Sequence, residues 1–441
     1  MGNSLVSMPA TRRFLYLAVG MIPLGRLLSV PLFASAGKVA ALTPIEIALA
    51  LVIVAYCGTK LWRGQWSTTH VPGFRVIMLF PLWCLVSLTI STVHFGLDIS
   101  ATAFSALYLA RWVGYSLLYF ITYEIAVDSH EVRKVAKWVL TGGIAFAGFG
   151  IAQAVFLPYD FALALYPDAR PYVDYDPQGH RLVSTFLDPN IAAGFLLIPT
   201  IIGLSFWAHG VKRWTVPLIV LLIAFAATVS RGGAVGFVVG VFFLFKAMGS
   251  LNRKVLKTSL VIIIVLLSLY PLLSTEIVEL NRFSLDDGSA MARLAEWKLA
   301  TDVIRDNWIV GIGFNTFGYI WPEYGPAREG GSAFGMENDF IMILMLTGIV
   351  GFAVYFRMYM TMLQPLADLR DKVNGSWDQA FGRGVWAATL GVTASSFFTT
   401  LILYPQIMAI LWILWALGRR LQKFTPVENP AAGLIPAPAR V

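Results

Sequence analysis

Three charged residues, Arg231, Arg293 and Glu337, are the main candidates for chemistry in this sequence. Arg231 lies in Ser230-Arg231-Gly232-Gly233, a tight turn between two apolar segments. There a guanidinium could hold a phosphate, and the glycines would let the backbone approach it closely. The alternative is an arginine that extends along the apolar surface to lipid head groups. An arginine at membrane depth is by default a candidate for function.

The other two residues also have a structural and a chemical interpretation. Arg293 could pair with Glu296 on a solvated helix face, a contact worth only about 0.2–0.5 kcal/mol. Glu337 precedes an apolar segment, where a carboxylate complements the helix dipole by about 0.3–1 kcal/mol. Alternatively, a partly desolvated glutamate can act as a general base. From these residues alone both interpretations stay open.

The chain that must position these residues has the composition of a membrane protein. Of its 441 residues, 57% are hydrophobic and only 13% are charged, whereas a soluble domain has about 25% charged residues. This composition excludes a soluble enzyme and predicts an all-α, polytopic integral membrane protein. The net charge of +8 requires no nucleic-acid partner, because most Lys and Arg fall in short segments on one predicted side of the bilayer.

Apolar stretches of about 20 residues can cross the hydrocarbon core as helices. The sequence predicts about 12 such spans, with both termini in the cytoplasm. They lie near residues 14–34, 42–62, 73–93, 101–125, 135–157, 190–208, 214–229, 232–248, 255–273, 339–362, 379–401 and 403–420. The first run imitates a secretory signal, but it exceeds the roughly 7–15 apolar residues of a signal, so we expect a retained span.

Two long polar segments are predicted to lie on the periplasmic side, at 158–189 and 274–338. Connections longer than about 12–15 residues are usually functional. The second segment contains the pattern of an amphipathic helix, with Ser289 as a possible N-cap. We therefore expect one polytopic domain over residues 1–424 and a disordered, cytoplasmic Pro/Ala tail at 425–441. The five histidines have no metal-ligand spacing, so we expect no metal and no cofactor.

Four motifs occur in a fixed order between residues 180 and 355. They are Arg181-Leu-Val-Ser-Thr-Phe-Leu-Asp-Pro-Asn190, then Ser230-Arg231-Gly232, then Arg293-x3-Trp297 with Gly311-Ile-Gly-Phe-Asn-Thr-Phe317, and finally Glu337-Asn338 with Gly348 and Gly351. Together they resemble the O-antigen ligase and O-antigen (exopolysaccharide) polymerase family of bacterial envelope glycosyltransferases. The resemblance implies a GT-C-like membrane enzyme of the bacterial inner membrane, with its active site on the periplasmic face.

The resemblance also implies a reaction. It is a metal-independent, inverting transfer of glycan from an undecaprenyl-diphosphate-linked donor onto a glycan or lipid A–core acceptor, for lipopolysaccharide O-antigen or exopolysaccharide. Arg231 and Arg293 match the arginines that hold the diphosphate in this family, and guanidinium groups suit that task. Four further polar residues are expected to bind substrate: Arg181, Asn190, Arg282 and Asn338.

One departure affects the expected mechanism. The family's usual histidine is replaced by Glu337, which slightly favours a polymerase-like member over a ligase. The competing hypothesis is a multi-pass transporter or lipid-linked oligosaccharide flippase, which often has internal repeats and midplane sites on broken helices. The sequence shows no repeat, and its informative polar residues lie outside the predicted bilayer.

Overall fold

The computed structural model describes residues 8–35, 38–64, 71–157, 181–249, 288–324, 336–372 and 376–424. Its described residues form α-helices with one small antiparallel hairpin. The longer helices are α1 (Pro9–Met21), α2 (Pro44–Trp62), α3 (Phe74–His94), α4 (Ile99–Ile125), α5 (Ser129–Phe156), α8 (Pro189–Ala208), α9 (Thr215–Ala227), α10 (Arg231–Ala247), α12 (Gly288–Asp306), α14 (Asp339–Lys372), α15 (Ser376–Ser395) and α16 (Pro405–Phe424). The shorter elements are η1 (Ile22–Leu24), β1 (Val30–Ser35), β2 (Lys38–Leu42), η3 (Ser184–Phe186), η4 (Lys212–Trp214), α13 (Phe317–Ile320) and η6 (Trp321–Glu323).

Six of the described helices are long and apolar enough to cross a membrane. They are α2, α3, α4, α5, α8 and α14 up to Leu369. The class of protein predicted from composition, an all-α membrane protein, is therefore confirmed. The predicted helices near 214–229, 232–248, 379–401 and 403–420 are also present, as α9, α10, α15 and α16. The predicted span at 255–273 lies outside the described residues, and the total of about twelve stays a prediction.

The prediction of one continuous helix over 14–34 is wrong. Helix α1 ends at Met21, and the chain then turns into the β1–β2 hairpin. Pro23 and Gly25 explain the break, because proline cannot continue a helix and Gly25 has φ +54°. A Cβ at Gly25 would lie 2.2 Å from the ring of Phe186, so the turn is packed directly against η3.

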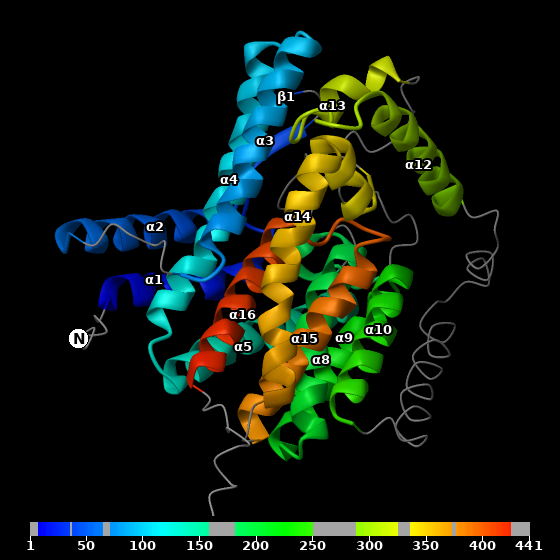
Figure 1. Ribbon diagram of the computed structural model, residues 1–441. Helices are drawn as coiled ribbons and strands as arrows, with labels where there is room; N and C mark the ends of the chain where they lie inside the picture. Colours follow the sequence, from blue (N-terminus) through cyan, green and yellow to red (C-terminus); the bar gives the residue numbers. More distant parts are fainter. Residues whose placement is uncertain are drawn as a thin grey trace, which may run out of the picture.

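The centre of the bundle is the packing of α8, α10 and α15, which lie side by side in Figure 1. Helix α8 is buried along nearly its whole length. Glycines on α10 allow the close approach: a Cβ at Gly236 would lie 2.6 Å from the Gly391 carbonyl on α15. One at Gly240 would lie 2.1 Å from Ile201 on α8. Small residues let helix backbones approach in membrane proteins, where van der Waals packing drives helix association.

Helix α14 is broken at Gly348, which has φ 64° and ψ −176°. The turn after α12 fills the break: Ile312 N–H donates to the Met345 carbonyl at 3.0 Å and Gly313 N–H to the Leu346 carbonyl at 2.9 Å. In return, Ile349 N–H donates to the Trp308 carbonyl at 2.8 Å. A broken helix leaves backbone groups without partners, and here the second chain segment supplies them.

Helix α3 closes the same junction from the other side. The Trp83 indole N–H donates to the Thr347 carbonyl at 2.8 Å, and the Ser87 hydroxyl donates to the Val310 carbonyl at 2.7 Å. Beyond the junction, α12, α13 and the first segment of α14 form a separate small core. Its buried members include Ala300, Val303 and Leu346. This small core holds α12 against α14 at the end of the molecule shown at the top of Figure 1.

We expect Gly348→Ala to destabilise the protein strongly. A Cβ there would lie 2.2 Å from the Ile309 carbonyl oxygen, in addition to the roughly 1–2 kcal/mol that an L-residue loses in this backbone region. Gly210→Ala is the matched control, because Gly210 has φ +80° but open space around the new Cβ. Thermal unfolding of the purified protein in detergent should separate the two variants. Equal shifts of the midpoint would show that the junction does not limit stability.

Candidate active site

The Ser230-Arg231 turn joins α9 to α10 and is held by Arg181. The Arg181 guanidinium donates to the Thr228 carbonyl at 2.8 Å, to the Val229 carbonyl at 3.3 Å and to the Asn190 side-chain oxygen at 3.2 Å. The Ser230 hydroxyl donates to the same Asn190 oxygen at 2.9 Å. Arg181 and Asn190, both predicted to bind substrate, therefore connect the start of α8 to the start of α10.

The backbone at this turn is strained. Val229 has φ +52°, in a region that β-branched residues rarely adopt and that costs of order 1–3 kcal/mol. The two hydrogen bonds from Arg181 to the carbonyls of Thr228 and Val229 hold this conformation. The strain lies next to Arg231, the exposed first residue of α10. Strained residues of this kind cluster at functional sites.

Asp188 is the N-cap of α8, and the charge of Glu337 acts on its carboxyl group. Its carboxylate caps α8 by accepting from the N–H groups of Asn190 at 2.7 Å and Ile191 at 3.0 Å. Burial raises the pKa of Asp188, the cap hydrogen bonds and then Arg181 oppose that rise, and the Glu337 carboxylate adds to it. Asp188 therefore links the start of α8 electrostatically to Glu337, the residue that precedes Asn338 at the start of α14.

Asn338 and Asp339 fix the start of α14. The Asn338 side-chain oxygen accepts from the N–H groups of Phe340 and Ile341, both at 3.0 Å, and its amide donates to the Phe397 carbonyl at 3.1 Å. The buried Asp339 carboxylate accepts from the N–H groups of Leu401 and Ile402, both at 2.8 Å. Both side chains thus hold the connection between α15 and α16.

That connection, residues 396–404, also touches α10. A Cβ at Gly232 would lie 3.0 Å from Phe398, and the rings of Phe397 and Phe340 pack at a tilt of 31° with centroids 4.5 Å apart. The 396–404 connection therefore lies between the helix that begins with Arg231 and the helix that begins after Glu337. Sequence analysis placed a span over 379–401, but α15 ends at Ser395 because the following backbone bonds to Asn338 and Asp339.

Arg293 lies in the N-terminal part of α12, as predicted, but its side chain lies outside the described part of the structure. Arg282 lies outside the described residues altogether. One turn after Arg293, the buried Trp297 indole N–H has no hydrogen-bond partner among the described residues. An unsatisfied buried donor is uncommon and marks a place where a ligand oxygen could bind.

The assignment of Arg231 and Glu337 to the site stays a prediction: Arg231 follows the turn held by Arg181, and the charge of Glu337 acts on Asp188 at the start of α8. The sequence pattern gave these two residues but not all of the contacts around them. It missed Asp188, Asp339 and the 396–404 connection. Asp188-Pro189 is a recognisable helix start, with an acidic cap before proline at the first helical position. No local signal reveals that Asp339 bonds to backbone 62 residues later. Among the described residues, no three His, Cys, Asp or Glu side chains form a group that could hold a metal ion.

We expect Asp339→Ala to lower the thermal midpoint while Asp339→Asn retains most of the stability. Alanine leaves two buried N–H groups without an acceptor, at about 1–3 kcal/mol each, whereas asparagine keeps one acceptor oxygen. Thermal unfolding in detergent measures both variants against the unchanged chain. A stable alanine variant would mean that the 396–404 connection is held by other contacts.

Comparison with known families gives the identity of this region. No curated protein matches the chain. Residues 216–356 match the family model described as O-antigen ligase. The matched segment contains Arg231, Arg293, Glu337 and Gly348, while Arg181, Asn190 and the 396–404 connection lie outside it. The match covers about a third of the chain and agrees with the O-antigen ligase resemblance that the motifs indicated.

Proposed function

We propose that the protein is an O-antigen ligase- or polymerase-type glycosyltransferase of the bacterial inner membrane. It transfers glycan from an undecaprenyl-diphosphate-linked donor to a sugar or lipid A–core acceptor on the periplasmic face. The chain crosses the bilayer about twelve times with both termini in the cytoplasm. The observation that supports the proposal is that the starts of α8 and α10 converge at the Arg181–Asn190–Ser230 network, and that the charge of Glu337, just before α14, acts on Asp188 in the cap of α8.

Three observations support this convergence. The Ser230 hydroxyl joins α10 to Asn190 on α8, Glu337 at the start of α14 acts on Asp188 at the start of α8, and Phe398 packs beside Gly232 on α10. A helix N-terminus carries about half a positive charge and favours anions. The Asp188 carboxylate already occupies the start of α8, so the positive charge available to a diphosphate comes from Arg231 and the start of α10.

In the proposed reaction, Arg231 and Arg293 bind the diphosphate and stabilise the charge that develops on it as it leaves. The acceptor hydroxyl attacks the anomeric carbon of the donor sugar, and the bond from that carbon to the phosphate oxygen breaks. The electron pair leaves with undecaprenyl diphosphate, and the carboxylate of Glu337 takes the hydroxyl proton. A single displacement of this kind inverts the configuration at the anomeric carbon.

The indole of Trp297 is evidence for a ligand site beside α12. Helical spacing places position 293 four residues before Trp297, on the same side of the helix, and Ala300 on this helix is buried in the small core against α14. The Trp297 indole N–H, which has no hydrogen-bond partner among the residues that the structure describes, is a suitable donor to a phosphate or sugar oxygen. A substrate lying between α12 and the start of α14 would satisfy it.

One structural feature favours the competing transporter hypothesis. Transporters often build substrate sites at broken membrane helices, and α14 is broken at Gly348. The carbonyls of Met345, Leu346 and Thr347 at this break all accept hydrogen bonds from protein donors, however. Because these carbonyls already have partners, the break offers little to a transported substrate. The polar residues Arg231 and Glu337 therefore make an enzyme the better-supported hypothesis.

We expect Arg231→Ala and Arg293→Ala to abolish glycan transfer while the protein still inserts, because each removes a permanent positive charge from the diphosphate. Arg213→Ala is the matched control, since Arg213 is an exposed arginine in η4. The glycan profile of a knockout strain complemented with each variant provides the measurement. Normal products from both active-site variants would rule the mechanism out, and the knockout itself would show whether repeat units or finished polymer accumulate.

We expect Glu337→Gln to lose activity and Glu337→His to keep part of it, because histidine can also accept the hydroxyl proton. Transfer by membranes carrying each variant, assayed with and without EDTA, tests both the base and the metal independence. The chelator should leave the unchanged enzyme active. Full activity of the glutamine variant would remove Glu337 as the base, and loss of activity with EDTA would require a metal.

A further inference from the structure

A second site lies at the other end of α12. A pocket of about 250 Å³ opens between the last turn of α3 and the turn that follows α12. Its polar members are Ser91, His94, Asp306 and Asn307, and its apolar members include Phe95 and Trp308. Trp308 is 58% exposed although it lies in the turn that packs against α14.

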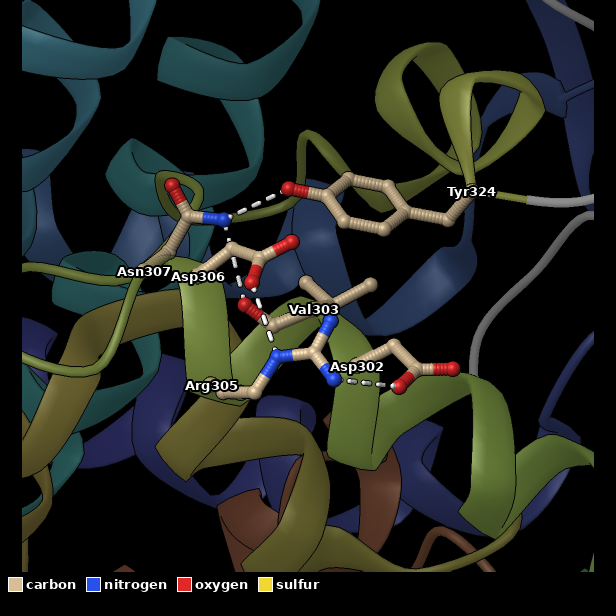
Figure 2. Close-up of polar contacts among 6 residues, drawn as sticks. All are labelled: Asp302, Val303, Arg305, Asp306, Asn307 and Tyr324. Carbon is tan, nitrogen blue, oxygen red and sulfur yellow. Dashed lines mark hydrogen bonds and ion pairs between the residues drawn. The ribbon is translucent and has the colours of Figure 1, made fainter.

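The walls of the pocket are fixed before any ligand binds. Asn307 donates from its side-chain amide to the Val303 carbonyl at 3.1 Å and to the Tyr324 hydroxyl at 2.8 Å, as Figure 2 shows. Its own carbonyl accepts from Gly311 N–H at 2.9 Å. The Ser87 hydroxyl holds the next part of the turn through the Val310 carbonyl. A preformed pocket avoids the entropy of ordering its walls on binding.

The charges around the pocket exclude an anionic ligand. Arg305 forms ion pairs with Asp302 at 3.3 Å and with Asp306 at 3.0 Å (Figure 2), so the two carboxylates outnumber the one guanidinium. The hydrogen bond and charge of Asp306 raise the pKa of Arg305. A diphosphate or an anionic lipid head group would be repelled by this surplus of negative charge.

The polar groups also exclude a purely hydrocarbon ligand, because Asp306, Asn307 and His94 would lose water without gaining partners. The remaining class carries many hydroxyl groups and an apolar C–H face. Its hydroxyls can bond to carboxylate, amide and imidazole groups, and its C–H face can stack on the electron-rich face of an indole. The pocket is smaller than the ~300–1,000 Å³ of sites for drug-sized ligands, which fits one sugar ring.

We propose that this pocket binds one sugar unit of a glycan chain, at a distance from the bond that is formed. Asp306 lies thirteen positions after Arg293, which corresponds to about 20 Å along α12 at 1.5 Å per residue. The pocket is therefore too far from the proposed diphosphate site for the sugar attached to the carrier lipid. It holds a unit further along the chain. The inference rests on the proposed function, and it adds a distal subsite that favours long glycans over short ones.

Trp308→Ala should reduce binding of a long glycan by roughly tenfold, the loss expected for one stacked ring. Because the site is distal, the KM for a long substrate should rise while turnover of a single-repeat substrate stays unchanged. Trp207→Ala is the matched control, since Trp207 is 48% exposed at the end of α8. His94→Ala, which removes an exposed side chain at the pocket mouth, is the second test variant.

The direct test uses saturation-transfer NMR with the full-length protein in nanodiscs of deuterated lipid. The probe is the polysaccharide released by mild acid from the envelope of the source strain. We expect saturation transfer to sugar protons in the unchanged chain and in Trp207→Ala, and a loss of transfer in Trp308→Ala and His94→Ala. If saturation transfer to the sugar protons is absent with the unchanged chain, or is equal in all four proteins, the proposed subsite is overturned.

A parallel measurement separates the subsite from a simple membrane anchor. The fluorescence of Trp308 is the part of the tryptophan emission that Trp308→Phe removes. If Trp308 lies among acyl chains, brominated phosphatidylcholine should quench that part, and this result would also overturn the proposal. Arg231→Ala provides the last control, because it should abolish transfer without changing binding at the pocket. If the unchanged protein shows no glycan transfer but Trp308→Ala still loses binding of the polysaccharide, only the proposed reaction is refuted and the subsite stands.

Discussion

The structure depends on one backbone junction, at which the chain after α12 completes the broken ladder of α14. Inside a bilayer every N–H and C=O must find a partner within the protein, so a helix can break only where other groups replace its own hydrogen bonds. The N–H groups of Ile312 and Gly313 do so for the carbonyls of Met345 and Leu346. This exchange fixes α12 relative to α14 with hydrogen bonds rather than with side-chain packing alone. The positions of Arg293 and Glu337 relative to each other follow from it.

The second organising feature is the use of side chains to tie helix starts together. Asp188, Ser230 and Asn338 each cap their own helix, and the same region carries contacts between helices. Asn190 accepts hydrogen bonds from both Arg181 and Ser230. These caps already satisfy N–H groups at the helix starts, whereas Arg231 at the edge of the cluster is exposed. In the proposed reaction the anion is therefore held by Arg231 rather than by the capped helix starts.

Helix α12 connects the two proposed ligand sites. Its N-terminal part carries Arg293, its buried face packs on the first segment of α14, and its C-terminal end forms the wall of the distal pocket. A polar helix held rigidly at the junction can therefore act as a support for an extended chain. Binding at two points along one polymer raises the effective concentration of the chain at the first point. This geometry relates the Trp308 pocket to transfer of long glycans.

Much of the protein could be predicted from the sequence, because lipid imposes a simple rule on composition. Runs of apolar residues gave the helices from α2 to α5 and α8 within a few residues, since a helix is the only way to satisfy a chain in hydrocarbon. The order of Ser230-Arg231-Gly232, the α12 pattern and Glu337-Asn338 indicated the family that the comparison confirmed. These features are local, and a local pattern is enough to determine them.

Tertiary structure alone decided the rest. The sequence contains Gly311, Gly313, Gly348 and Gly351, but only the folded chain shows that a Cβ at Gly311 would lie 2.5 Å from the backbone nitrogen of Gly348. The turn at Pro23 and Gly25 replaced a predicted span because its backbone packs against Phe186. Asp339 reaches Leu401 and Ile402 across a long separation in sequence. Contacts of this kind depend on which helix faces meet, and no periodicity within one segment specifies its neighbour.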